Sequence, residues 1–339
     1  MRIGFVVNRL RSLRSTYTTT RLAVSAARTG HQVVFIDVNG FTLDPANRLL
    51  ATAYQLPAGE HEPEALVEDA RRGALPRGVV DLEALDGLVL RNNPVRRTVL
   101  DGARGLRVRG VPVFNDPDGL AAGAGKFALG DLPVHLKPRT LITRDADALR
   151  AFFRALDGPA VVKPIRGFGG RAVVLLQPDE ERRLDAYAER IRETSDGYVV
   201  LQEYCPAAER GDKRILLVEG RPVGCYVRMR KEGEFRHNIH VGGQPRPGSL
   251  DDADREICAA LAGRLHRDGV FLAGLDVIGQ RAVEVNVVAP GGVANIERTA
   301  GRPIADHFVE RLVERMQREG NSTGPGRQEP GWTGTARRR

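Results

Sequence analysis

The sequence that decides the fold is LDVIG at residues 275–279, followed closely by VEVN at residues 283–286. Asp276, Glu284 and Asn286 offer hard oxygen ligands of the kind that bind Mg²⁺. Glu284 and Asn286 are two positions apart in an apolar, β-branched run, so on a strand both side chains leave the same face. Burying such groups unpaired costs several kcal/mol. The pattern therefore indicates either a metal-binding strand or a half-exposed strand whose polar face meets water.

The hairpin geometry sets a condition on this metal site. With a two-residue turn at residues 279–280, Asp276 would pair with Val283 and point away from the face that carries Glu284. A shared metal site therefore requires an odd-length turn or a β-bulge near residues 279–281.

A glycine-rich segment, VVKPIRGFGGRAVV, occupies residues 161–174. An apolar run ends at Lys163, then Gly167, Gly169 and Gly170 follow, and a second apolar run begins. Glycines permit positive φ and close backbone approach, so amide groups can converge on phosphate oxygens while the lysine supplies positive charge. The segment matches neither the P-loop nor the dinucleotide fingerprint, because strand-like residues follow the glycines. A simple hairpin with a glycine loop is the alternative.

In order along the chain, these motifs resemble the ATP-grasp superfamily, and within it the bacterial glutathione synthetases. The resemblance extends from about Arg2 to about Leu312. Only five of the 51 basic residues are lysines, and Lys126 and Lys163 lie where a nucleotide site needs them. The ordered segments are IGFVV at 3–7, LRNNP at 90–94, VFNDP at 113–117, KF at 126–127, KP at 163–164 with the glycine loop, QEYCPA at 202–207, GDKR at 211–214, GGQ at 242–244, and the LDVIG and EVN pair.

The resemblance implies an α/β fold with ATP-grasp architecture, in which two α+β units clasp ATP. Residues 1–115 alternate apolar runs at 3–7, 32–37, 87–90 and 112–114 with a helical pattern at 18–28. This alternation predicts a mostly parallel sheet with helices on its faces. Substrates bind beyond the carboxyl ends of such strands, which makes Asn8 and Arg91 candidate contacts. The expected units are an N-terminal substrate-side α/β domain (1–118), a small unit with the glycine-rich loop (119–200), a C-terminal unit with the metal site (201–319) and a disordered tail (320–339).

The resemblance also implies ATP and Mg²⁺ as cofactors, with Mn²⁺ as an alternative metal. ATP-grasp ligases phosphorylate a substrate carboxylate and let an amine displace the phosphate, which releases ADP. The implied nucleotide contacts are Lys126, Lys163, Gly167, Gly169, Gly170, Gln202, Glu203, Tyr204, Cys205 and Asp212. The implied metal ligands are Asp276, Glu284 and Asn286, and the implied catalytic or substrate-binding residues are Arg214, Arg236 and Asn238.

Departures from the family pattern concern the substrate side. The family's L-D-G-M-G-G loop is replaced by Ile165 and Arg166 before Gly167, and Ala294 stands where the family has arginine. Loss of a cation there shifts which carboxylate is accepted. The expected activity is therefore a peptide or γ-glutamyl amide ligation between small amino-acid-type substrates. True glutathione synthesis, a catalytically silent nucleotide-binding protein and an ATP-grasp kinase are the alternatives.

Bulk composition fits this class. The 339 residues are 42 % hydrophobic, and no apolar run approaches the ~20 residues needed to span a bilayer. The formal charge of +8 is partly due to the C-terminal tail, and no stacking aromatics accompany the basic residues, which disfavours nucleic acid as a partner. Three well-separated cysteines predict free thiols in a reducing cytoplasm. No signal peptide is evident, and a homo-oligomer is left open.

Overall fold

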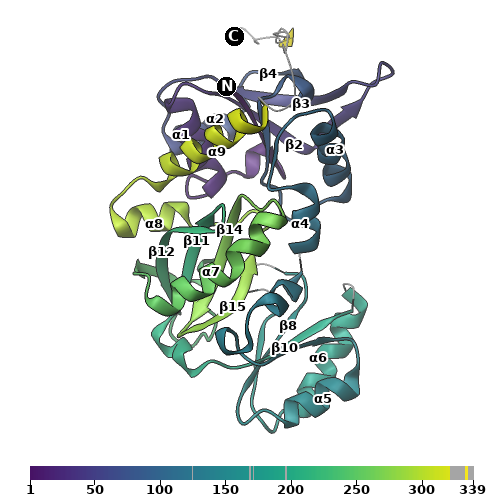
Figure 1. The fold of residues 1–339 in the computed structure, drawn as a ribbon, viewed down its shortest axis with the longest axis vertical. Helices are drawn as coiled ribbons and strands as arrows, with labels where there is room; N and C mark the ends of the chain where they lie inside the picture. Colours follow the sequence, from purple (N-terminus) through teal and green to yellow (C-terminus); the bar gives the residue numbers. More distant parts are fainter. Residues whose placement is uncertain (124, 168, 171, 195–196, 321–332, 335–339) are drawn as a thin grey trace.

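The computed structural model describes residues 1–339 except 124, 168, 171, 195–196, 321–332 and 335–339. Its strands form a seven-stranded, a five-stranded and a four-stranded sheet, which follow one another from top to bottom in Figure 1. The helices are α1 (Thr18–Arg28), α2 (Pro63–Arg72), α3 (Arg97–Val108), α4 (Pro117–Gly123), α5 (Ala146–Arg154), α6 (Glu181–Thr194), α7 (Asp252–Arg267), α8 (Val293–Ala300) and α9 (Ile304–Gly320). Short 3₁₀ helices are η1 (Leu10–Ser12), η2 (Leu82–Ala84), η3 (Lys126–Asp131), η4 (Val134–Leu136), η5 (Pro206–Arg210) and η6 (Ile239–Val241).

The seven-stranded sheet has the order β16-β4-β3-β2-β1-β5-β6. Its strands are β1 (Arg2–Val7), β2 (Gln32–Leu43), β3 (Leu49–Leu56), β4 (Arg77–Asp81), β5 (Gly87–Leu90), β6 (Val113–Phe114) and β16 (Thr333–Gly334). The β2-β1-β5-β6 half is parallel, as the sequence predicts, and β3 and β4 extend it antiparallel. Successive residues of β1 face opposite sides, so Phe5 packs with α1, α2 and α9 whereas Val6 packs with α3.

The C-terminal helix α9 returns to this N-terminal sheet and packs along α1 (Figure 1). Of the expected disordered tail, residues 321–332 and 335–339 lie outside the described residues. Thr333 and Gly334 form β16, which pairs antiparallel with β4. The expectation of a segment without structure is therefore wrong at these two residues, because the open edge of the sheet gives them backbone partners.

The four-stranded sheet has the order β7-β10-β8-β9, with α5 and α6 in its core. Its strands are β7 (Thr140–Thr143), β8 (Ala160–Pro164), β9 (Val174–Leu176) and β10 (Val199–Glu203). β8 and β9 flank the glycine-rich loop as the expected hairpin. β10 lies between β7 and β8 and pairs with both, so the expected boundary at residues 200–201 falls inside a central strand of this small sheet.

The five-stranded sheet has the order β13-β12-β11-β14-β15. Its strands are β11 (Asp212–Val218), β12 (Arg221–Met229), β13 (Gln244–Pro247), β14 (Leu272–Ile278) and β15 (Arg281–Asn286). One face packs Ile215 and Leu275 against α7. The other face is divided: Leu216 packs with the residues of α8 at one end, whereas Asp212 and Arg214, on the same side of β11, carry charge at the other end.

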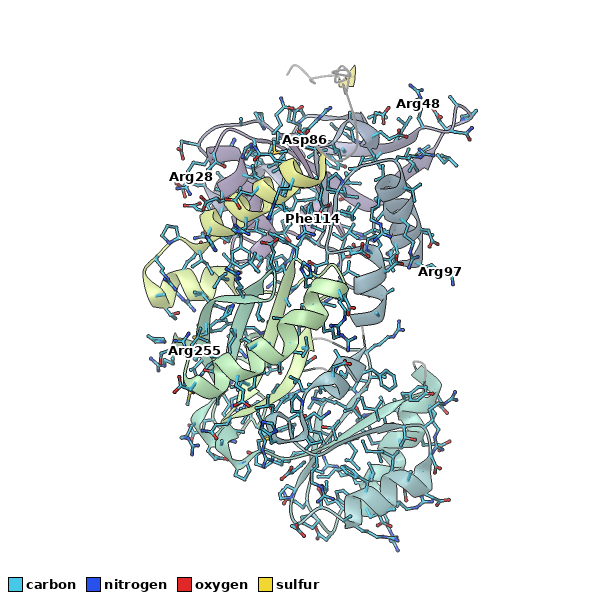
Figure 2. All side chains as sticks on the ribbon, in the orientation of Figure 1. Arg28, Arg48, Asp86, Arg97, Phe114 and Arg255 are labelled. Carbon is cyan, nitrogen blue, oxygen red and sulfur yellow. The ribbon has the colours of Figure 1, made fainter. Side chains whose placement is uncertain are left out.

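Several surface arginines pair with acidic residues nearby in the sequence. Arg48, Arg97 and Arg255 project from the body of the molecule (Figure 2), and Arg48 pairs with Asp44 four residues away at 2.8 Å. Such exposed pairs contribute little stability.

All three cysteines are free and buried, as predicted. Among the described residues, no helix is both long and apolar enough to cross a membrane.

Asn115 joins the N-terminal sheet to the five-stranded sheet. Its buried Nδ2 donates to the carbonyls of Leu272 at 2.8 Å and Val287 at 2.9 Å, and its Oδ1 accepts from the N–H of Leu272 at 2.7 Å. Asn115→Ala would leave these backbone groups unsatisfied, so we expect urea titration to show a loss of at least ~2 kcal/mol in unfolding free energy. Asn39→Ala is the control, because Asn39 is exposed and accepts an exposed hydrogen bond from Arg96. Equal losses in both variants would contradict this role.

Candidate active site

The hairpin of β14 and β15 brings the predicted metal residues together. The strands join through a two-residue turn, and the register then shifts so that Asp276 pairs directly with Glu284. Val283 is the extra residue of this β-bulge. The bulge that the metal site requires is therefore present, but its expected position near residues 279–281 is wrong. The turn itself stays tight because Gly279 adopts a φ of +61°.

Three oxygen-bearing side chains share this face of the hairpin. Asn286 Nδ2 donates to Oδ2 of Asp276 at 3.4 Å. Asp276 is buried, whereas Glu284 and Asn286 are half-buried at the edge of the site. Two carboxylates and one carboxamide form a hard-oxygen donor set that fits Mg²⁺. The set has only two acidic members, in keeping with the finding that no three His, Cys, Asp or Glu side chains gather as a metal cluster within the described residues.

Two buried arginines, one on β11 and one on β12, contact Asp276. Arg214 contacts both carboxylate oxygens, through Nε to Oδ1 and through Nη2 to Oδ2 at 2.9 Å. Arg228 Nη2 lies 3.0 Å from the same Oδ2 and 2.5 Å from Oδ2 of Asp212. Nη1 of Arg214 donates to the carbonyl of Gly291 at 3.0 Å, so each of the three guanidinium nitrogens makes a contact, and these contacts use three of its five N–H groups. The result is one continuous charged network of two arginines and two aspartates.

The sequence interpretation missed Arg228. Strand pairing places Arg228 directly opposite Asp212 and Arg214 opposite Asp276, so the four charges alternate across three strands. An arginine in the otherwise apolar run of residues 222–229 was the available signal. Its meaning depends on the register between β11 and β12, which the sequence does not fix.

Burial and pairing shift the pKa values within this network. Burial acts to raise the pKa of Asp276, but attraction to Arg214 and Arg228 outweighs it, and the pKa lies well below the ordinary range. Burial raises the pKa of Asp212, and attraction to Arg228 offsets this rise only in part. Burial lowers the pKa of Lys163, although Glu284 acts in the opposite direction. Asp276 is therefore the firmly ionised acid of the site.

Lys126 and Lys163 approach the hairpin from the small unit. Lys126, in η3, is buried with Nζ 3.4 Å from Oε1 of Glu284. Lys163, at the end of β8, donates to Gln202 Oε1 at 3.1 Å and to the carbonyl of Val283 at 3.2 Å. Both lysines thus reach the bulge of the five-stranded sheet from across the boundary between the sheets. This arrangement concentrates positive charge beside the acidic face.

The glycine-rich loop contacts the segment that carries Arg236 and Asn238. Arg236 Nη1 donates to the carbonyl of Gly170 at 2.9 Å, while Nε and Nη2 bind Glu234. The hydrogen bonds from Arg236 lower the pKa of Glu234 to about 2. Gly170 has a φ of +74°, and a Cβ there would lie only 2.5 Å from Oδ1 of Asn238. Glycine is required at this position because any side chain would clash with Asn238. Gly169 also adopts positive φ, at +67°.

Residues 202–205 lie at the end of β10, where the chain passes from the four-stranded to the five-stranded sheet. Gln202 is buried and donates from Nε2 to Thr140 at 2.9 Å. The N–H of Glu203 donates to the carbonyl of Arg139 at 2.9 Å, and its carboxylate accepts from Arg281 at 3.0 Å. The hydroxyl of Tyr204 reaches Glu209 at 3.4 Å. Burial raises the pKa of Cys205 to about 11, so this thiol is neutral.

The candidate residues from the N-terminal sheet lie at the carboxyl ends of β1 and β5. Asn8 is exposed and donates to the carbonyl of Asn93 at 2.5 Å. Arg91 donates to Pro290, one residue before the Gly291 that Arg214 contacts. The loop from β15 to α8 therefore connects the charged network with the N-terminal sheet.

Comparison with solved structures defines the class of the fold as that of ATP-grasp ligases. The chain superimposes on D-cycloserine synthetase with a TM-score of 0.66 at 17 % identity, over 93 % of this chain and 99 % of the other. The D-alanine–D-alanine ligase of Bacillus anthracis complexed with ATP gives 0.58 at 15 % identity, over 96 % and 100 %. An ATP-grasp ligase complexed with its minimal precursor gives 0.57 at 18 % identity, over 92 % and 98 %.

Sequence comparison then defines the family. Residues 126–301 match the model of the prokaryotic glutathione synthetase ATP-grasp domain, and the chain belongs to this family. It is 41 % identical to the glutathione synthetase of Parasynechococcus marenigrum over 60 % of this chain and 65 % of the relative. It is 35 % identical to that of Brucella melitensis over 69 % and 75 %. The match to the Parasynechococcus marenigrum relative thus spans less than two thirds of that protein. The resemblance inferred from the motifs is confirmed.

Proposed function

We propose that the protein is an ATP- and Mg²⁺-dependent carboxylate–amine ligase, which forms an amide bond through an acyl phosphate and releases ADP. The observation that carries the proposal is the charged face of the five-stranded sheet. Two carboxylates and a carboxamide lie at the bulged hairpin. Arg214, Arg228 and the two lysines from the small unit lie beside them. This combination provides oxygen ligands for a hard cation together with positive charge for a polyphosphate.

The nucleotide would lie between the small unit and the five-stranded sheet. Lys126 and Lys163 would hold the phosphates, and Gly167, Gly169 and Gly170 would cover them. Residues 202–205 would line the adenine, as the family resemblance implies. Asp212 fits a ribose contact, because its Oδ1 is buried and has no hydrogen-bond partner among the described residues. A buried acceptor of this kind requires a donor to offset its desolvation.

The reaction would depend on positioning and charge neutralisation more than on a protein acid or base. Mg²⁺ at Asp276, Glu284 and Asn286 would supply charge neutralisation at the phosphates. Arg214 would stabilise the negative charge that develops on the transferring phosphoryl group, because a planar guanidinium can donate to two oxygens at once. Arg236 and Asn238, which contact the glycine-rich loop, would keep it closed over substrate and exclude water.

The test is ADP formation by the purified protein with ATP and Mg²⁺, screened across pairs of carboxylate and amine substrates. Mass spectrometry of the products identifies the bond formed. An amide product that appears only when both substrates are present supports the ligase. A phosphorylated substrate that accumulates as the final product would identify a kinase, and ATP binding without any turnover would indicate a silent nucleotide-binding protein.

Glutathione synthesis is the second candidate within this class, and the name of the relatives favours it. The residue at 294 argues for another pair, because Ala294 offers no charge where the family has arginine. We expect γ-glutamylcysteine with glycine to be a poorer pair than some other amino-acid or dipeptide pair. Steady-state kinetics decide the matter: a glutathione-forming kcat/KM of about 10⁴ M⁻¹s⁻¹ or more would refute this expectation.

A further inference from the structure

The carboxylate of Asp276 already receives hydrogen-bond donors from three other strands. Its Oδ1 accepts from Nε of Arg214. Its Oδ2 accepts from Nη2 of Arg214 at 2.9 Å and from Nδ2 of Asn286 at 3.4 Å, and Nη2 of Arg228 lies 3.0 Å from the same oxygen. An ionised carboxylate offers about four lone-pair sites, and these contacts occupy them. A metal ion that binds Asp276 must therefore displace at least one donor.

The charges beside the two acids also oppose a metal ion. The side chains of Asp276 and Arg228 are each 4 % exposed and that of Arg214 is 11 % exposed, so water screens these charges little. The second acid, Glu284, has Nζ of Lys126 at 3.4 Å. Each acid of the candidate metal site is thus paired with a cation of the protein itself, and metal binding has to compete with these pairs.

The contacts of the two arginines indicate which of them can leave Asp276. Arg228 also lies 2.5 Å from Asp212, so its departure would leave two buried aspartates without this cation. The remaining contact of Arg214 is the neutral carbonyl of Gly291 at 3.0 Å. Because uncovering a buried charge is costly, displacement of Arg214 costs less than displacement of Arg228.

The surroundings of Arg214 leave its stem room to move. Two glycines lie beside it: a Cβ at Gly274 would be 3.5 Å from Cδ of Arg214, and a Cβ at Gly292 would be 3.5 Å from its Cγ. Neither position supplies a side chain that would hold the stem in one rotamer. A change of rotamer at Arg214 can therefore move the guanidinium away from Asp276 without a shift of the backbone.

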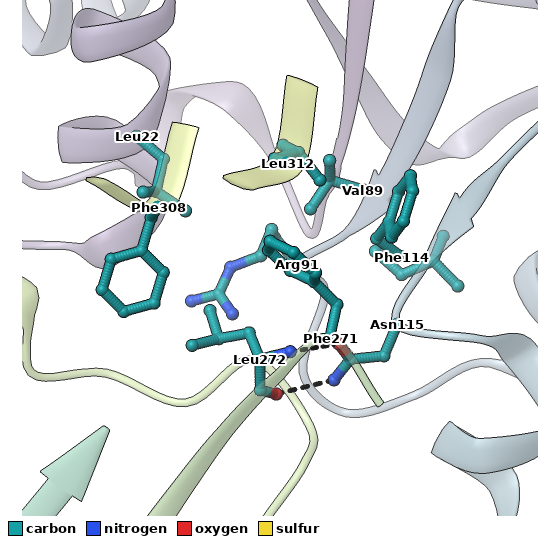
Figure 3. A pocket seen from close by; sticks show the side chains of 10 residues that line it. Leu22, Val89, Arg91, Phe114, Asn115, Phe271, Leu272, Phe308 and Leu312 are labelled. Atoms are coloured by element: carbon teal, nitrogen blue, oxygen red, sulfur yellow. Dashed lines mark hydrogen bonds between the residues drawn. The ribbon is translucent and has the colours of Figure 1, made fainter. Parts of the chain in front are cut away.

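The loop before α8 does not depend on Arg214 for its position. Arg91 donates from Nη2 to the carbonyl of Pro290 at 2.9 Å, one residue before Gly291. Figure 3 shows the guanidinium of Arg91 among apolar side chains such as Leu272, in a cavity of about 10 Å³. This second arginine keeps the loop attached to the N-terminal sheet when the bond from Arg214 to Gly291 is broken.

We propose that Arg214 and a divalent cation compete for Asp276, and that cation binding moves the guanidinium from this aspartate to the phosphates of the nucleotide. The inference rests on the proposed function, which assigns the metal to Asp276 and the phosphoryl contact to Arg214. The ion pair between Arg214 and Asp276 is then an autoinhibitory contact. It lowers the affinity for metal, and it keeps the guanidinium from the phosphates until a metal ion takes its place.

The experiment measures Mn²⁺ binding to the full-length protein without nucleotide, by electron paramagnetic resonance of free Mn²⁺ and by calorimetry. We expect Arg214→Met to bind Mn²⁺ at least ~10-fold more tightly than the wild type, because Asp276 loses its two-pronged partner. Arg214→Lys keeps the charge but loses the planar fork, so its affinity should rise several-fold. Adding Glu284→Gln to either variant should remove the gain, which would place the bound ion at this site.

The lysine variant separates competition for Asp276 from a general effect of charge, and it decides the result alone if the methionine variant does not fold. Arg230→Met is the matched control, because the ion pair of Arg230 among the described residues is with Glu209. Affinities of the Arg214 variants that do not exceed the wild-type value, or an equal gain in Arg230→Met, overturn the proposal. The ligase proposal fails separately, through absent ADP formation from every substrate pair, whatever the Mn²⁺ affinities are.

Discussion

Glu284→Gln is expected to lower ADP-forming turnover by at least ~100-fold while the protein stays folded. The substitution keeps the size of the side chain but removes one of the two carboxylates from the candidate metal site. Glu284 is half-buried, and among the residues that the structure describes its one ion pair is the 3.4 Å contact with Lys126. Melting temperature should therefore change by only a few degrees. Raising Mg²⁺ from about 1 mM to 50 mM should restore part of the activity if the loss is one of metal affinity.

Asp276→Asn is the less informative variant at this site. On the sequence alone, both substitutions are expected to leave folding nearly intact. The structure changes that expectation for Asp276, because this carboxylate is buried and neutralises Arg214 and Arg228. Loss of its charge would destabilise the sheet as well as the metal site. Glu310→Gln on α9, where Glu310 is 69 % exposed, provides the control for glutamine substitution itself. Full turnover of Glu284→Gln at ordinary Mg²⁺ concentrations would contradict the assignment of Glu284 as a metal ligand.

Local sequence patterns were sufficient to predict those helices and strands whose apolar periodicity lies within the element itself. The helix expected at residues 18–28 is α1 with the same bounds, and the strand expected at residues 87–90 is β5. The glycine-rich hairpin also follows from local signals, because an apolar run, a turn and a second apolar run determine it. The requirement for a β-bulge was predictable from strand alternation, since Asp276 and Glu284 cannot otherwise share a face.

Long-range pairing was not predictable from these patterns. The bulge lies at Val283. Which residue forms the bulge depends on how both strands pack, and the sequence pattern does not contain this information. Arg228 was missed for the same reason: its partner Asp212 lies on another strand, and only the register brings the two together. The position of β10 between β7 and β8, which crosses the expected domain boundary, likewise depends on tertiary pairing that propensity does not encode.

Arg228→Met should produce the largest loss of stability, about 3–5 kcal/mol in unfolding free energy at pH 7. Arg228 is buried and contacts Asp212 at 2.5 Å and Asp276 at 3.0 Å. Asp276 would keep Arg214, whereas the structure shows no second cation in contact with Asp212 among the described residues. Arg230→Met is the control, because Arg230 follows the same strand, its side chain is 31 % exposed, and within the described residues its ion pair is with Glu209. Its loss should stay within ~1 kcal/mol.

The pH dependence of Arg228→Met distinguishes an uncompensated charge from a packing defect. The folded pKa of Asp212 is already raised by burial, so ionisation of this group costs stability at pH values above the ordinary carboxyl pKa of about 4. Removal of Arg228 raises that pKa further, because the cation that opposes the burial effect is gone. The difference in unfolding free energy between variant and wild type should therefore shrink as the pH falls from 7 towards 4. Asp212→Asn combined with Arg228→Met should recover part of the loss at pH 7, since a neutral amide is less costly to bury than a carboxylate. A loss that is equal at all pH values and unchanged in the double variant would show that Arg228 acts only through its packing volume.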